Sequence, residues 1–190
     1  MGKNAKKLLK DASLELILKK GPKAVRVQEI CKLAGVSKMS FYYYYDNKRH
    51  IIEDVIKGWL DQLLEESKQI MNCNIPFSEK IVELVEWKAD FVKSMSQAFL
   101  QELYDSDGEY SYLVKDIMSE TQKLTYMFFS SGKKQGELNK NVDVSTIMLW
   151  MNIISDMAIE GKFNQLFDDP KEMNKQIRNL MLYGVLGNTK

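Results

Sequence analysis

The stretch that most constrains the fold of this chain is residues 26–48, RVQEICKLAGVSKMSFYYYYDNK. Its first half carries apolar residues at the spacing i, i+3, i+4 and i+7, which marks one face of a helix. These residues are Val27, Ile30, Cys31 and Ala34. Gly35 follows directly, and glycine readily takes the left-handed conformation that ends many helices. Ser37 then suits the N-cap of a second helix. The pattern therefore predicts two short helices joined by a tight turn.

The second of these helices contains a run of four tyrosines, at positions 42–45. They cannot all face inward, because successive side chains on a helix point in different directions, so at least two must be exposed. Phe41 and Tyr45 lie four positions apart and are expected to pack inward. A helix this short is not stable in water alone, so neighbouring elements must hold it. Its outer faces then present hydroxyls, a cation and aromatic rings, which is how a helix-turn-helix meets a DNA major groove.

These residues resemble the N-terminal domain of TetR-type (tetracycline-repressor-like) transcriptional regulators. The resemblance rests on the spacing AGVSK…FYYYY…NK, with Ala12 and Leu16 on a preceding helix and Gly21 at its end, and it covers residues 5–58. GKKQGEL at 132–138, followed by a long apolar helix, is similar to the second domain of that family.

The resemblance implies an all-α fold with two parts. An N-terminal three-helix helix-turn-helix DNA-binding domain is expected at 1–48, and a larger helical ligand-binding and dimerisation domain at 49–190. The chain departs from the family pattern at Arg26, where Ser or Thr usually caps the second helix, so only the Glu29 half of a capping box is expected. Met39 replaces a commonly small residue, and Cys31 a usual alanine.

Charge is distributed unevenly along the chain, although its total is only +1. Residues 1–58 carry 13 Lys+Arg and 6 Asp+Glu, a net charge of +7, whereas residues 59–190 carry 14 and 20, a net charge of −6. This asymmetry is typical of a basic DNA-binding head on an acidic body. The alternative for any one lysine is an ordinary solvated surface position, but the motif favours phosphate contact at Lys38 and Lys48.

Roles can be assigned to the predicted DNA-binding residues as hypotheses. Tyr42 and Lys48 are expected to bind phosphate oxygens and so fix the register of the helix on the duplex. Met39, Ser40 and Tyr43 are expected to touch base edges, since Met or Tyr can lie against a thymine methyl and Ser can serve several bases. Tyr44 could do either. The full predicted set is Arg26, Ser37, Lys38, Met39, Ser40, Tyr42, Tyr43, Tyr44 and Lys48.

The remainder of the chain is predicted to be helical. The family resemblance implies further roles for these helices. TetR-like proteins dimerise through their last two long helices and bind a small molecule among the middle ones. Residues 143–160 and 170–186 are then the expected homodimer interface, and 77–131 the walls of an effector pocket. Asn152, Asp156 and Glu160 form a polar stripe expected at solvent or at the dimer seam. The pocket candidates, for which ordinary core packing is the alternative, are Trp87, Phe91, Met95, Phe99, Met118, Thr121, Gln122 and Tyr126.

Other classes of protein fit the sequence less well. An enzyme is disfavoured because His50 is the only histidine and no Gly-rich phosphate loop, zinc spacing or paired-carboxylate motif occurs. Cys31 and Cys73 lack motif spacing, which suggests reduced thiols in the cytoplasm. The most apolar segment, 148–159, is too short and too polar to span a bilayer. Neither a cofactor, a metal nor a membrane partner is expected.

The sequence therefore predicts a ligand-responsive, sequence-specific DNA-binding transcriptional regulator. Repression of a palindromic operator, relieved by an unidentified small-molecule effector, is the expected behaviour, with activation left open. A two-fold homodimer would place its reading helices about one turn of DNA, ~34 Å, apart. The alternative is a helical protein-interaction module without specific DNA binding, which salt dependence would distinguish because phosphate contacts weaken steeply with added salt.

Overall fold

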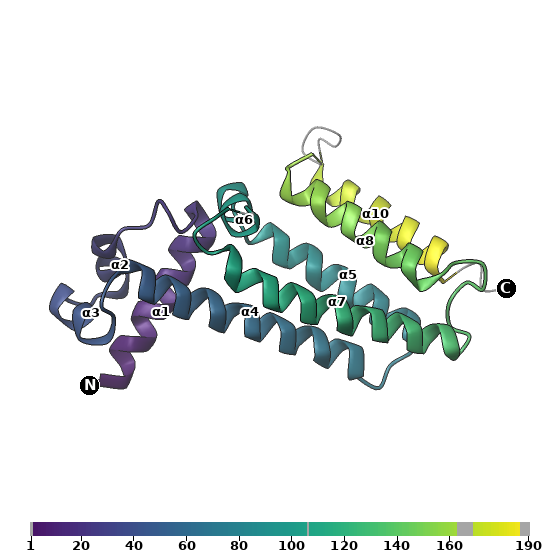
Figure 1. Ribbon diagram of the computed structural model, residues 1–190, viewed down its shortest axis with the longest axis horizontal. Helices are drawn as coiled ribbons and strands as arrows, with labels where there is room; N and C mark the ends of the chain where they lie inside the picture. Colours follow the sequence, from purple (N-terminus) through teal and green to yellow (C-terminus); the bar gives the residue numbers. More distant parts are fainter. Residues whose placement is uncertain (1, 106, 163–168, 187–190) are drawn as a thin grey trace. The chain divides into compact units, whose positions relative to one another are not determined.

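The computed structural model describes residues 2–105, 107–162 and 169–186, and their regular structure is entirely helical (Figure 1). The all-α prediction is thereby confirmed. The helices are α1 (Gly2–Lys20), α2 (Val27–Ala34), α3 (Lys38–Tyr44), α4 (Lys48–Asn72), α5 (Phe77–Lys93), α6 (Gln97–Tyr104), α7 (Ser111–Lys134), α8 (Val144–Ile159) and α10 (Pro170–Val185). The short helix α6 was not predicted from the sequence.

The chain forms two compact units, and each unit combines two separate segments of the sequence. The first consists of Met1–Leu63 and Lys93–Ile117, and the second of Leu64–Val92 and Met118–Lys190. Helices α4 and α7 each contribute residues to both units. The first unit therefore extends beyond the helix-turn-helix, because the start of α4 and the segment containing α6 pack onto α1–α3 within it.

The core of the first unit explains how two very short helices stay folded. Helices α2 and α3 have only 8 and 7 residues, too few to be stable alone. Each inserts fully buried side chains between α1, α4 and α6, and full burial of one such apolar side chain contributes about 1.5–3 kcal/mol. The core includes Leu9 and Ile17 of α1, Ile30 of α2, Phe41 of α3, Ile52 and Ile56 of α4, and Phe99 of α6.

The second unit has a separate core, formed by Ile81, Phe129, Leu138, Ile147, Met181 and Val185. Helix α7 continues through Gly132 and ends at Lys134. The ring of Phe77 occupies the space where a side chain at position 132 would lie, and it stacks on Phe128 with centroids 4.6 Å apart. Glycine at 132 therefore permits close packing rather than ending the helix.

One lysine organises the loop that follows α7. The Lys133 ammonium donates hydrogen bonds to the carbonyl oxygens of Asn139 (2.9 Å), Lys140 (2.9 Å) and Val142 (2.6 Å). The backbone N–H of Asn139 in turn donates to the carbonyl of Val185 at 2.8 Å. These bonds fix residues 139–142 between the end of α7 and the end of α10.

Candidate nucleic-acid interface

The turn between α2 and α3 has the geometry expected of a helix-turn-helix. Gly35 adopts a left-handed conformation, with φ of +63°, and the backbone N–H of Val36 donates to the carbonyl of Cys31 at 3.0 Å. The hydroxyl of Ser37 accepts a hydrogen bond from the N–H of Ser40 at 3.0 Å, which caps α3. The predictions for Gly35 and Ser37 are both confirmed.

The tyrosine run is divided between core and surface. Phe41 and Tyr45 are buried as predicted, and Tyr45 ends the helix as its C-cap. Tyr42 and Tyr43 are 56% and 80% exposed, whereas Tyr44 is half-buried against the first core. The requirement that at least two of the four tyrosines be exposed is therefore met.

A polar network fixes the end of α3. The hydroxyl of buried Tyr45 donates to Asp54 Oδ2 at 2.8 Å, and Lys10 donates to Asp54 Oδ1 at 3.0 Å. Burial raises the pKa of the Tyr45 hydroxyl, and the Asp54 carboxylate raises it further. Burial also raises the pKa of Asp54, but the bonds from Tyr45 and Lys10 outweigh it and hold that pKa below its usual value. The network ties α3 to both α1 and α4.

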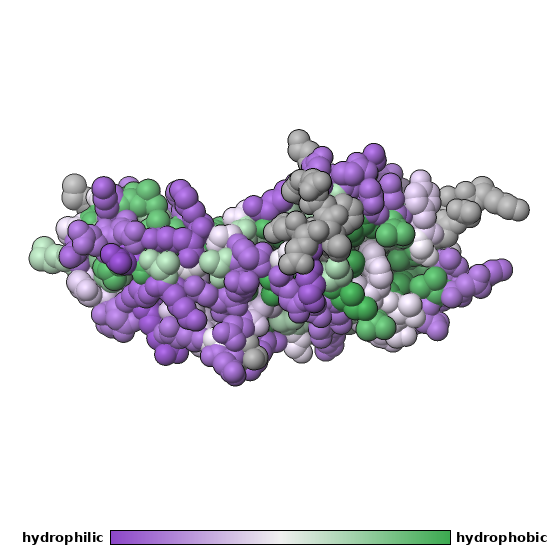
Figure 2. Space-filling view, turned by 90° about the horizontal axis from the view of Figure 1, so that it is seen from above, coloured by the Kyte–Doolittle hydropathy of each residue, from purple (hydrophilic) through white to green (hydrophobic). Residues whose placement is uncertain are grey.

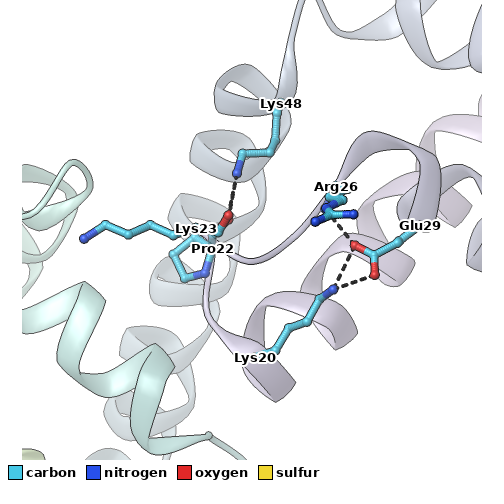
Figure 3. Close-up of polar contacts among 6 residues, drawn as sticks. All are labelled: Lys20, Pro22, Lys23, Arg26, Glu29 and Lys48. Carbon is cyan, nitrogen blue, oxygen red and sulfur yellow. Dashed lines mark hydrogen bonds and ion pairs between the residues drawn. The ribbon is translucent and has the colours of Figure 1, made fainter.

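The start of α2 lacks the usual side-chain cap, as the sequence indicated (Figure 3). Glu29 Oε2 accepts the backbone N–H of Arg26 at 3.0 Å, but the exposed Arg26 guanidinium carries only donors and cannot complete the capping box. Lys20 instead donates to both Glu29 oxygens, at 2.7 and 2.8 Å. Its hydrogen bond lowers the pKa of the Glu29 carboxyl, whereas burial acts in the opposite direction.

Lys48, predicted to bind phosphate, already makes structural hydrogen bonds. Its ammonium donates to the carbonyl oxygens of Pro22 (3.1 Å) and Lys23 (3.0 Å) in the turn before α2, a contact drawn in Figure 3. The N–H of Lys23 donates to Glu102 Oε2 of α6 at 2.8 Å. An ammonium has three donors, so one remains on Lys48 for another acceptor. Sequence reasoning did not indicate a role for Glu102, which lies 79 positions from Lys23.

The predicted pocket residues lie in different surroundings. Phe99 belongs to the unpredicted helix α6 and lies in the first core, with its ring 5.4 Å from that of Trp59. Met95 lines a shallow hollow of the first unit that also contains Lys19 and Lys93. Trp87 stacks on Phe91, with ring centroids 5.9 Å apart, and its indole N–H donates to Glu66 at 3.0 Å.

The remaining four pocket candidates, Met118, Thr121, Gln122 and Tyr126, are exposed on α7. Gln122 and Tyr126 line a groove between α7 and α8, together with Met148 and Leu149. Within the second unit, Gln122 and Tyr126 thus line this open groove, Trp87 and Phe91 form the stack, and Met118 and Thr121 belong to neither.

Two other features bear on function. No described helix is long and apolar enough to cross a membrane. In the described ranges, no group of three or more His, Cys, Asp or Glu side chains is arranged to hold a metal ion.

Comparison with known proteins agrees with the local geometry. Residues 9–55 match the model of the family described as "Bacterial regulatory proteins, tetR family". The chain is 22% identical over 158 residues to the HTH-type transcriptional repressor KstR2 of Rhodococcus jostii (strain RHA1), covering 80% of this chain and 76% of that protein. It is 23% identical over 137 residues to the fatty acid metabolism regulator protein of Bacillus subtilis (strain 168), covering 70% and 71%.

The fold is likewise shared over almost the whole chain. The crystal structure of the transcriptional regulator FadR from Bacillus subtilis, in complex with stearoyl-CoA, is similar with a TM-score of 0.70 at 20% identity, covering 94% of this chain and 98% of that one. The helix-turn-helix segment, residues 9–55, is thus that of the tetR family of bacterial regulatory proteins, and the whole chain shares its all-helical fold with FadR.

Proposed function

We propose that this protein is a ligand-responsive, sequence-specific DNA-binding regulator that represses transcription from a palindromic operator until a small molecule releases it. The observation that carries the proposal is the construction of α3. Phe41 and Tyr45 anchor the helix in the core, while Met39, Tyr42 and Tyr43 project from it. A helix held by its neighbours, with an exposed outer face, is what insertion into a major groove requires.

Electrostatics support a nucleic-acid partner for the same region. Residues 1–58 have a net charge of +7, and Arg26 and Lys38 are exposed around the helix-turn-helix. We assign phosphate contact to Tyr42, Lys38 and the remaining donor of Lys48. DNA binding is accordingly assigned to residues 1–48, and ligand binding and dimerisation to residues 49–190.

Helices α8 and α10 support the proposal of a homodimer. Figure 2 shows apolar side chains gathered among polar ones over this part of the chain. Leu149 and Ile153 of α8 are exposed four positions apart, and Leu180 and Tyr183 of α10 are exposed three positions apart. Large apolar side chains at helical spacing mark a surface that another protein covers. A second copy of the chain would cover it and would place two reading helices on one duplex.

The chemical class of the effector is proposed from a similar structure. The similar FadR structure holds stearoyl-CoA, which supports a small organic molecule bound among the helices of residues 49–190. Of the pocket candidates, Trp87 and Phe91 combine an apolar stack with a tethered indole. They are the pair whose fluorescence and substitution would report an occupied pocket.

The test is a titration of the purified full chain against a fluorescent duplex carrying its own upstream intergenic DNA, at several salt concentrations. We expect tight binding that survives excess random competitor and weakens with salt, because each neutralised phosphate contributes a slope of about −0.9 in log K against log salt. Lys38→Met should reduce that slope by about 1. Lys57→Met, which removes an exposed lysine of α4, is the matched control and should leave the slope unchanged.

The outcomes distinguish a sequence-specific DNA-binding regulator from the alternatives. Binding that random competitor abolishes would leave only a basic surface without sequence preference. Failure to bind any duplex would favour the alternative, a helical protein-interaction module.

A further inference from the structure

The outward face of α3 is apolar, although the domain around it is basic. Met39 and Tyr43 are 84% and 80% exposed, the two highest values for a large apolar side chain in the described part of the chain. They lie four positions apart and therefore share one face of the helix. Figure 2 shows the end of the chain formed by α1–α3 as a mainly hydrophilic surface with a few apolar groups at its tip.

The other three faces of α3 have different occupants. Phe41 and Tyr45 form the core-facing pair. Ser40 is half-buried, and its hydroxyl lies 3.0 Å from that of Ser37, so the two hydroxyls are hydrogen-bonded to each other. Lys38 and Tyr42 are exposed on one flank. The Met39–Tyr43 face is thus the one left to point directly into a groove.

Side chains that recognise purines by paired hydrogen bonds are missing from this face. Arg or Lys reads guanine, and Asn or Gln reads adenine, through two atoms at once. Helix α3, with the sequence KMSFYYY, contains no Arg, Asn or Gln, and its single lysine is Lys38 on the flank. The forked side chains of this region lie outside α3: Arg26 and Gln28 at the start of α2, and Asn47 and Arg49 at the start of α4.

We infer that α3 recognises its half-site by apolar contact of Met39 and Tyr43 with the C5-methyl groups of thymines, so that A·T pairs lie beneath it. The thymine methyl is the apolar group that a base pair presents in the major groove. A thioether and a phenol ring are both suited to pack on it. This inference rests on the proposed function and specifies the chemistry of the operator.

The methyl groups can be removed one at a time without altering base pairing. A duplex would first be selected from a random-sequence library with the purified full chain. Each thymine of that duplex would then be replaced singly by deoxyuridine, which lacks only the methyl. We expect about a fourfold loss of affinity at each contacted position, the equivalent of about 0.8 kcal/mol for one buried carbon group. Thymines outside the α3 contacts should tolerate the change.

A substitution in the protein tests which side chain contacts the thymine methyl. Met39→Ala preserves helix propensity and removes no core contact, so a circular dichroism melt should match that of the wild type. Its ratio of thymine to deoxyuridine affinity should fall to about one at the positions that Met39 contacts, as a double-mutant cycle requires. Met127→Ala removes another exposed methionine, on α7 in the second unit, and should leave every ratio unchanged.

Three results would overturn the inference, and they are distinguishable. If the selected duplex keeps its full affinity after all deoxyuridine replacements, DNA binding stands but methyl recognition is wrong. A selected half-site of G·C pairs whose affinity depends on Lys38 would assign the reading to that cation instead. Failure to enrich any sequence would remove both this inference and the proposed function.

Discussion

Replacement by phenylalanine should have different effects at two tyrosines that lie three positions apart. Replacing Tyr45 by Phe removes the buried hydroxyl that donates to Asp54 Oδ2 at 2.8 Å. Replacing Tyr42 by Phe removes a hydroxyl from a side chain that is 56% exposed. We expect Tyr45→Phe to lower the stability of the protein, and Tyr42→Phe to lower its affinity for DNA.

The magnitudes follow from the surroundings of each hydroxyl. A hydrogen bond to a charged group contributes about 1.5–3 kcal/mol. The lower end applies at Tyr45, because the Asp54 side chain is 34% exposed and keeps its bond to Lys10. A loss of about 1.5 kcal/mol corresponds to a fall in Tm of about 3–6 °C for a chain of this size. Tyr42→Phe should change stability by less than about 0.5 kcal/mol. Loss of one phosphate hydrogen bond, about 1.4 kcal/mol, should weaken DNA binding about tenfold.

Both quantities can be measured on the same preparations. Circular dichroism melts give Tm, and fluorescence titration of the selected duplex well below the lower Tm gives Kd. A Tyr45→Phe protein that melts at the wild-type temperature would show that the Asp54 bond contributes nothing. A Tyr42→Phe protein that melts early but binds DNA normally would refute the division of roles along α3.

Three further predictions concern stability alone. The pKa of Asp54 is lower in the folded protein than in the unfolded chain. Ionised Asp54 therefore stabilises the fold above the unfolded pKa of about 4, and this stabilisation is lost as pH falls through the folded pKa. Asp54→Asn should accordingly flatten the dependence of Tm on pH below about pH 4. Gly132→Ala should destabilise by about 1–2 kcal/mol because the new methyl collides with Phe77. Its matched control Gly58→Ala, in open space on α4, should stabilise by about 0.5–1 kcal/mol; equal effects in chemical denaturation would contradict the packing at 132. Lys133→Met removes donors from three backbone carbonyls and should cost about 1–2 kcal/mol, measured by the midpoint of urea unfolding.

The parts of the fold that sequence reasoning predicted are those set by neighbouring residues. Gly35 permits the left-handed turn, Ser37 caps the next helix, and the spacing of Phe41 and Tyr45 selects the buried face. Each of these determinants acts within about one turn of helix, so each is visible in a short window of sequence. The same holds for Arg26, whose lack of an acceptor predicted the half-formed cap.

The contacts that sequence reasoning missed join residues far apart along the chain. Glu102 accepts the N–H of Lys23 across 79 positions, and nothing near either residue indicates the pairing. The same limit applies to Phe99, whose aromatic character did not indicate that its ring would lie against Trp59. Apolar periodicity predicts that a side chain is buried, not which neighbour buries it.

Lys48 shows why a basic residue in a recognised motif needs the structure to define its role. Its charge and position predicted phosphate contact, yet two of its three donors close the turn at Pro22 and Lys23. The two roles are compatible, because an ammonium held by two carbonyls is placed in a fixed direction for a third acceptor.

The repeated use of tyrosine in α3 has a physical basis. A tyrosine side chain combines an apolar ring with a polar hydroxyl, so the same residue type serves the core, the flank and the outward face of one helix. At position 45 the ring is buried and the hydroxyl reaches Asp54. At positions 42 and 43 the rings project outward, where the hydroxyl can meet a phosphate and the ring a base edge. The run is therefore not a single aromatic patch, because helical geometry turns each successive ring toward a different environment.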